Sequence, residues 1–249
     1  FFEVVMMLRS KFIPAAFFLL GAQLNAAEIS TYEVPEASKD KHEEAFYEKS
    51  FNYEDALSNL QIVLIVDKSG SQQAPDSHPV SDTPAKGMLG DRWTQWDNTF
   101  YAAKYLAESV FEYDADGTVP IVFFGNDANV VEAKGVGQML VAFKKNKPTR
   151  ETTNLVSALR AAFQSYSTPS KEGERILFIV LTDGAPNAGQ PDQVKQMIKE
   201  NITSAGVSKE TLNVLFVRIG DDPGATSFLK DPDDCSDVGD AVDTKSDNM

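Results

Sequence analysis

The sequence predicts a doubly wound α/β fold, in which helices flank both faces of a mostly parallel sheet. Two runs of large apolar residues, 62–66 and 176–181, are unbroken rather than alternating. Such runs are typical of strands buried on both faces of a parallel sheet. Segments with apolar residues at helical spacing alternate with these and other apolar strands. That order predicts parallel βαβ units with right-handed crossovers.

The elements can be assigned in chain order. The first strand, 61–66, precedes a long loop over 72–91 that is rich in Pro, Ser, Asp and Gly. Aromatic and aliphatic residues at helical spacing predict a helix over 92–113, and a turn and a strand at 119–124 follow it. The remaining elements are an edge strand, two helices, a strand, a helix, a strand and a short helix, expected at 129–132, 136–143, 154–166, 176–181, 191–204, 212–219 and 226–229.

Residues 1–27 predict a signal peptide. Basic residues precede a short apolar stretch, 12–20, and small residues follow it. This is the pattern of a secretory signal, and the apolar stretch is too short to span a bilayer comfortably. We expect the signal to start at Met7 and to be cut near Ala26 or Ala27. The alternative is a segment that stays in the mature protein.

The remaining chain divides into a linker and one domain. Residues 28–59 carry nine Asp and Glu against three Lys, which indicates a solvated acidic linker. Residues 60–245 then form a single domain with one sizeable core.

Composition excludes several classes of function. The net charge of −14 argues against nucleic-acid binding, because contact with phosphates needs clustered Lys and Arg. The sequence holds one Cys and two His, too few for an intrachain disulfide or for the usual His/Cys zinc site. A Ser-His-Asp hydrolase is disfavoured for the same reason.

Polar residues follow two of the buried strands. Asp67, Ser69 and Ser71 come after the first strand, Asp183 follows the strand at 176–181, and Thr153 opens a helix. In open parallel sheets, ligands bind beyond the carboxyl ends of the strands. Carboxylates and hydroxyls are hard ligands that suit Mg²⁺, Ca²⁺ or Mn²⁺. Each residue alone could instead cap a helix, but the combination favours a metal site.

The three segments that contain these residues resemble the von Willebrand factor type A domain. They are Asp-x-Ser-x-Ser at 67–71, Thr-Asn at 153–154 and Thr-Asp-Gly at 182–184. The resemblance covers about residues 60–220 and extends toward Asp243. Lys68 departs from the pattern, since the family often has Asp or another small polar residue there.

The resemblance implies both a ligand set and a function. In the family these segments form the metal-ion-dependent adhesion site, so the ligands of Mg²⁺, or of Ca²⁺ or Mn²⁺, are expected to be Asp67, Ser69, Ser71, Thr153 and Asp183. The implied function is that of a non-catalytic binding module, whose cation bridges to a carboxylate of a protein partner. With a signal peptide, it would act as a secreted or periplasmic protein, or in the lumen of the secretory pathway, with no integral membrane span after signal removal.

Two alternatives remain at this stage. One is a cytoplasmic regulatory or assembly subunit of a chelatase- or ATPase-type complex. The other is a metal-dependent hydrolase, which is disfavoured because no base is placed beyond the metal shell. The chain lacks a phosphate-binding Gly-Lys-Ser/Thr loop, which argues that it is not itself an ATPase.

Overall fold

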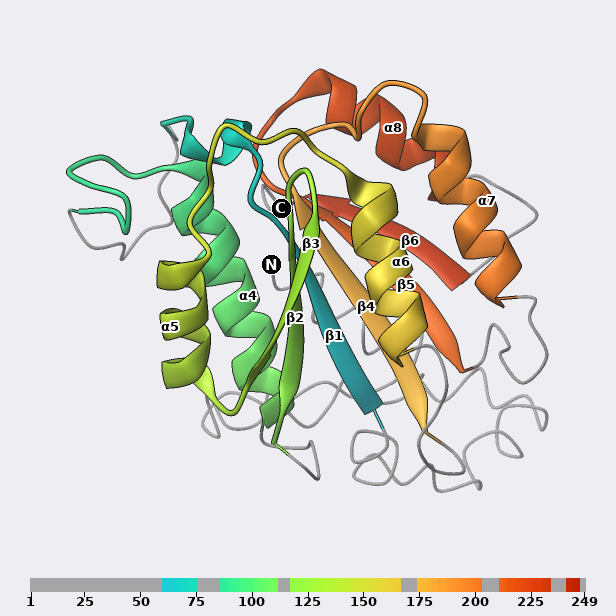
Figure 1. Cartoon of the computed structure of the whole chain (residues 1–249), viewed down its shortest axis with the longest axis horizontal. Coiled ribbons are helices and arrows are strands. Elements are labelled where there is room, and N and C mark those ends of the chain that lie inside the picture. Colours follow the sequence, from blue (N-terminus) through green and yellow to red (C-terminus); the bar gives the residue numbers. More distant parts are fainter. Residues whose placement is uncertain are drawn as a thin grey trace, which may run out of the picture. The chain divides into compact units, whose positions relative to one another are not determined.

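A six-stranded sheet forms the centre of the structure, in the order β3-β2-β1-β4-β5-β6 (Figure 1). The computed structural model describes residues 60–75, 86–111, 117–166, 174–202, 211–233 and 241–246. The strands are β1 (Leu60–Asp67), β2 (Val119–Phe124), β3 (Ala128–Ala133), β4 (Arg175–Thr182), β5 (Leu212–Arg218) and β6 (Val242–Ser246). The predicted signal peptide over 1–27 and the linker over 28–59 lie outside the described residues.

Five of the six strands run parallel. β1 lies between β2 and β4, β4 pairs with β5, and β5 pairs with β6, all in parallel register. The edge strand β3 is antiparallel to β2, which a short turn allows. β1 and β4 are almost wholly buried, as their unbroken apolar sequences predict.

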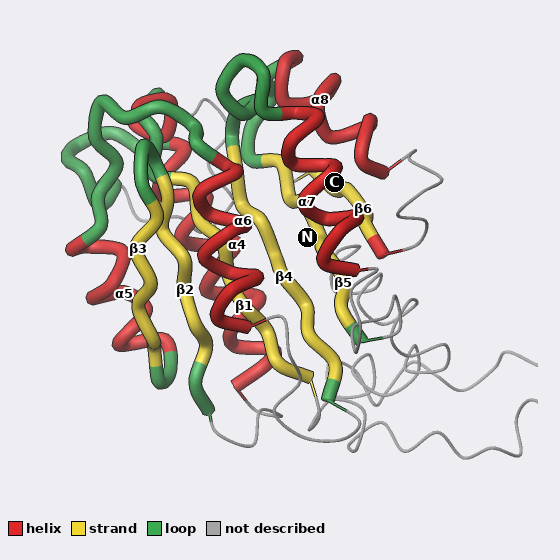
Figure 2. Tube along the Cα trace, turned by 45° about the vertical axis from the view of Figure 1, so that its right-hand side comes forward, coloured by secondary structure: helices red, strands yellow, loops and turns green. Residues whose placement is uncertain are grey.

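Helices cover both faces of the sheet (Figure 2). They are η2, a single 3₁₀ turn (Gly70–Gln73), and α4 (Gln95–Phe111), α5 (Val136–Lys145), α6 (Leu155–Tyr166), α7 (Pro191–Ile202) and α8 (Pro223–Asp233). On one face, Phe163 of α6 packs against Phe178 of β4, and α7 and α8 join the same core. On the other, Trp96 of α4 and Phe143 of α5 pack against Phe123 of β2. The doubly wound α/β fold is therefore confirmed.

Local capping sets several element boundaries that differ from the expected ones. α4 begins at Gln95 rather than at Arg92, because the carboxylate of Asp97 accepts hydrogen bonds from the N–H and the hydroxyl of Thr94 at 2.9 and 2.6 Å. α8 is longer than the helix expected at 226–229. It begins at Pro223, and the carboxylate of Asp222 accepts the N–H of Ala225 at 2.7 Å.

Two elements are absent from the sequence-based assignment, η2 and β6. The sequence of β6, Val-Asp-Thr-Lys-Ser, is short and polar, and the strand is defined by its pairing with β5. Among the residues that the structure describes, every helix is too short or too polar to cross a membrane.

Candidate metal centre

The candidate site begins where β1 and β4 end side by side. Val66 of β1 is in register with Leu181 of β4, so Asp67 and Thr182 follow on adjacent strands. Asp67 is completely buried, and its Oδ2 accepts a hydrogen bond from the Thr182 hydroxyl at 2.7 Å. Parallel pairing thus brings a carboxylate from residue 67 and a loop that starts at residue 183 to one edge of the sheet.

The turn after β1 adds two hydroxyls to this edge. The Ser69 N–H donates to Asp67 Oδ1 at 2.8 Å, which folds the chain back over the carboxylate. Ser69 Oγ and Ser71 Oγ share a hydrogen bond of 2.9 Å, and Ser71 Oγ donates to Asp183 Oδ1 at 2.8 Å. Four of the five expected ligands therefore form one hydrogen-bonded group. Ser71 is its exposed member, so the group opens to the surface.

Thr153 is tied to the same edge through the loop that follows Asp183. The Thr153 N–H donates to Asn187 Oδ1 at 3.1 Å, and the Asn187 N–H donates to the Thr153 carbonyl at 3.0 Å. These two bonds join the segment before α6 to the segment between β4 and α7. Thr153 therefore lies on the segment that borders the other four residues, and the role of all five residues as ligands stays a prediction.

Burial and mutual repulsion act on the two carboxylates. Burial raises the pKa of Asp67 above its usual range, although hydrogen bonds from Ser69 and Thr182 favour the charged form. Burial and the charge of Asp67 raise the pKa of Asp183 to about 7, against which the hydrogen bond from Ser71 acts. Two buried carboxylates this close are costly to ionise together, and a divalent cation between them would remove that cost.

The donor set fits a hard cation. Within the described ranges, no group of three or more His, Cys, Asp and Glu side chains is placed to hold a metal ion. The candidate site instead combines two carboxylates with hydroxyls, which suits Mg²⁺, Ca²⁺ or Mn²⁺ better than zinc or copper. Hydroxyl groups can rotate, so Ser69 and Ser71 can turn a lone pair toward a cation.

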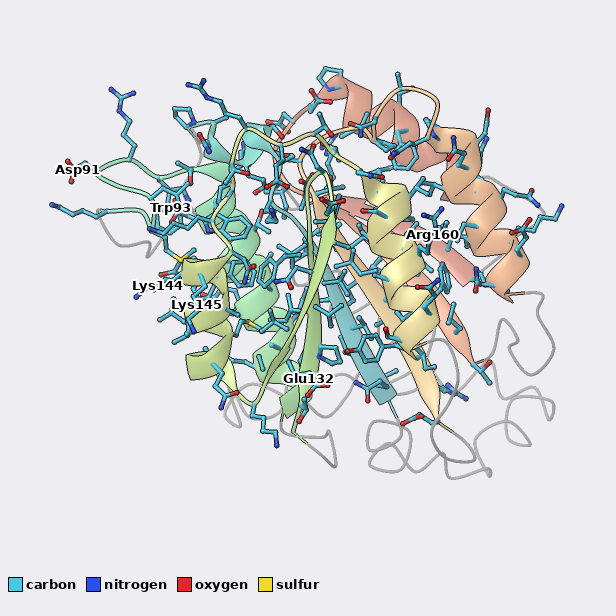
Figure 3. All side chains as sticks on the ribbon, in the orientation of Figure 1. Asp91, Trp93, Glu132, Lys144, Lys145 and Arg160 are labelled. Atoms are coloured by element: carbon cyan, nitrogen blue, oxygen red, sulfur yellow. The ribbon has the colours of Figure 1, made fainter. Side chains whose placement is uncertain are left out.

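Lys68, the basic residue next to the expected ligands in the sequence, forms an ion pair with Glu151. Its Nζ contacts both carboxylate oxygens of Glu151 at 2.8 and 2.9 Å. The hydrogen bond from Lys68 is the main cause that lowers the pKa of Glu151 to about 2. Other labelled cations in Figure 3, Lys144, Lys145 and Arg160, project from the helices α5 and α6 rather than from these loops.

Several supporting residues were missed by the sequence analysis. Thr182 was noted only as part of the Thr-Asp-Gly pattern, yet it orients Asp67. Gln72 is fully buried in η2, where its Oε1 accepts the Thr99 hydroxyl of α4 at 2.8 Å. Asn126, in the turn after β2, accepts the N–H and the hydroxyl of Thr152 at 3.0 and 2.9 Å. The sequence does show polar residues next to the predicted ligands, such as Thr182 and Gln72. It does not show which side chains they bond to, because those partners lie far away in the sequence.

Comparison with known proteins identifies the fold. No protein-family model matches the chain, and no curated protein matches it. Among solved structures, a D319A mutant of the PilB minor pilin from Streptococcus sanguinis matches with a TM-score of 0.55 and 12% identity, covering 77% of this chain. This chain spans 58% of the length of that structure.

Two further solved structures match the chain at low identity. The hypothetical protein BatB from Bacteroides thetaiotaomicron matches with a TM-score of 0.50 and 15% identity over 76% of this chain and 91% of its own. The SpRpn10 VWA domain has a TM-score of 0.48 and 11% identity over 75% of this chain and 86% of its own. At these identities the matches show the fold alone, and that fold is the doubly wound α/β sandwich that the von Willebrand factor type A resemblance implied.

Proposed function

We propose that this chain is a non-catalytic protein-binding module that depends on a divalent cation. Asp67, Ser69, Ser71, Thr153 and Asp183 hold Mg²⁺, or Ca²⁺ or Mn²⁺, at the carboxyl edge of the sheet. One observation carries the proposal: two buried carboxylates and two hydroxyls from separate loops form a single hydrogen-bonded group there. A bound cation of this kind supplies an open coordination position to an oxygen ligand, such as a carboxylate of a partner protein.

The chain's own residues prepare the site for this role. Asp67 is fixed by the Ser69 N–H and the Thr182 hydroxyl, so its orientation is set before any cation binds. Asp183 is held by Ser71, whose exposure leaves this side of the site open to a partner. Asp183 is followed by Gly184 and Ala185, whose small side chains leave room for a partner beside the site. This arrangement favours binding of a protrusion that ends in an acidic side chain.

A binding role is also favoured over catalysis by the charges around the site. Lys68 is the basic residue next to the ligands, and it is bound to Glu151 rather than free to accept or donate a proton. The charged side chains among the contacts that define the site are the carboxylates of Asp67 and Asp183, which the proposal uses as ligands of the cation. We therefore assign it no reaction.

Export belongs to the same proposal. The module at 60–245 follows an acidic linker at 28–59, and a signal peptide at 1–27 directs it to the outside of the cell, a periplasm or the secretory lumen. N-terminal sequencing of the protein purified from its source tests this. A mature chain that begins near residue 27 or 28 supports export, and a chain that retains residues 12–20 contradicts it.

Cation and partner binding can be tested with one pair of variants. Titration with Mn²⁺, followed by electron paramagnetic resonance, should show one site in the wild-type chain and none in Asp183→Ala. Asp192→Ala is the matched control, because its side chain is 94% exposed on α7 and its loss leaves the site intact. Proteins retained by the immobilised wild type in Mg²⁺ should be lost with chelator and with Asp183→Ala. If the same proteins are retained in chelator and by Asp183→Ala, the proposal is contradicted.

A further inference from the structure

A partly buried ion pair lies beside the candidate metal centre, at the residue where the sequence departs from the adhesion-site pattern. Lys68 stands between Asp67 and the first site serine, Ser69. Its ammonium group contacts both carboxylate oxygens of Glu151, 83 residues further along the chain, at 2.8 and 2.9 Å. The Lys68 side chain is 14% exposed and that of Glu151 is 24% exposed, so solvent screens the pair only in part.

Glu151 is held from two further directions. The Thr149 hydroxyl donates to its Oε1 at 2.6 Å, and the Asn126 N–H donates to its Oε2 at 3.0 Å. A Cβ atom on Gly125 would lie 2.0 Å from Oε2, so glycine at that position makes room for the carboxylate. Glu151 therefore sits in a cradle between the loop before α6 and the turn after β2.

The backbone around Glu151 is bonded to the turn that carries the site serines. The Gly70 N–H donates to the Glu151 carbonyl at 3.0 Å, and the Thr149 N–H donates to the Lys68 carbonyl at 3.3 Å. The charge of Lys68 also reaches the first ligand: burial raises the pKa of Asp67, and the positive charge of Lys68 is among the causes that oppose this rise. A charge that acts on the Asp67 carboxylate also acts on a divalent cation beside it.

We propose that Glu151 is a positioning residue for the cation, which neutralises Lys68 and holds its ammonium group away from the ligands. The inference rests on the proposed function, since it concerns the affinity of the same site. Coulomb's law in water, for a unit charge and a divalent ion about 10 Å apart, corresponds to about fourfold weaker binding, and to more in less polar surroundings. Removing Glu151 exposes the cation to that repulsion.

The test is a double-substitution cycle on the full chain: Glu151→Gln, Lys68→Met, and both together. Met and Gln keep nearly the length and shape of the side chains that they replace. At low ionic strength we expect Glu151→Gln to weaken Mn²⁺ binding about fourfold. Adding Lys68→Met should restore the affinity to within about twofold of the wild type, because no unpaired positive charge is left. The loss in Glu151→Gln should also shrink near 1 M salt, where the screening length is about 3 Å.

A matched control separates charge at the site from charge in general. Lys104 and Glu108 form an ion pair of 3.4 Å on α4, nine or more residues beyond its first residue, Gln95. Glu108→Gln removes the same charge at a distance along the helix, and should change Mn²⁺ affinity less than twofold.

The possible results discriminate clearly. The affinity for Mn²⁺ could fall equally in both single variants and in the double variant, at all salt concentrations. That result would mean that the ion pair only holds the loops together, and it overturns the inference. Wild-type affinity in Glu151→Gln overturns it as well. If the wild type itself binds no Mn²⁺, the proposed function fails, whereas binding that ignores Glu151→Gln contradicts this inference alone.

Discussion

Individual side chains at the candidate site have separable tasks. Asp67 is completely buried and receives two hydrogen bonds, whereas Ser71 lies at the surface and links the turn to Asp183. Orientation therefore depends on the buried donors, and access depends on the exposed hydroxyl. Substitutions of the two kinds should have different effects on stability and on binding.

Thr182→Val tests the orienting role at the residue scale. Val has nearly the shape of Thr and suits a strand, but it removes the hydroxyl that donates to Asp67 Oδ2. Leaving a buried carboxylate short of a donor costs about 1–3 kcal/mol, so we expect a loss of that size in the free energy of unfolding. Urea unfolding in chelator measures it. A variant as stable as the wild type would show that the bond contributes nothing.

The pH dependence of the metal-free protein is a second prediction at this scale. Because the folded-state pKa of Asp183 is raised to about 7, the folded chain binds this proton more tightly than the unfolded chain does. Stability in chelator should therefore fall as pH rises from about 4 to about 7, and level off above that. In Asp183→Asn this part of the fall should be missing. Parallel stability profiles for the two proteins contradict the raised pKa.

At the scale of elements, the sequence was sufficient to predict those strands whose hydrophobic pattern alone determines their position. The unbroken apolar runs predicted β1 and β4, because strands buried on both faces need apolar residues at every position, and the mainly apolar segments at 119–124 and 212–219 predicted β2 and β5. The sequence was insufficient to predict β6, since Val-Asp-Thr-Lys-Ser is polar and its strand is defined by pairing with β5. Likewise, Asp67 and Asp183 could be predicted as neighbours from topology. The pairing of Lys68 with Glu151 could not, because it depends on how two loops pack.

Substitution of Gly125 tests how these loops pack, and Gly137, in the helix α5, provides the control. Gly125→Ala places a Cβ atom 2.0 Å from the Glu151 carboxylate, so the loop before α6 must move and the protein should lose stability. Gly137→Ala, in α5, has open space around it and should gain up to about 1 kcal/mol. Thermal unfolding of the two variants compares the same chemical change in opposite surroundings. Similar melting temperatures would mean that Glu151 is free to leave its cradle.

At the scale of the whole molecule, the parallel sheet joins a rigid core to a set of loops at its carboxyl edge. The apolar interior lies between the two helical layers, and the site side chains lie where β1 and β4 leave it. Ligand substitutions at the exposed end of this edge should therefore alter cation binding and leave the fold intact. The acidic net charge of −14 would disfavour an acidic partner unless a cation bridges the two surfaces.

The central claim is that Asp183 and its neighbours bind a divalent cation in the folded chain. The most direct test is thermal unfolding of the wild type, Asp183→Ala and the control Asp192→Ala, each in millimolar Mg²⁺ and in chelator. At a hundredfold excess over the dissociation constant, cation binding stabilises by about 2.7 kcal/mol, or roughly 5–10 °C for a domain of this size. We predict that shift for the wild type and the control, and its loss in Asp183→Ala. A wild-type melting temperature that is the same in Mg²⁺ and in chelator would contradict the account.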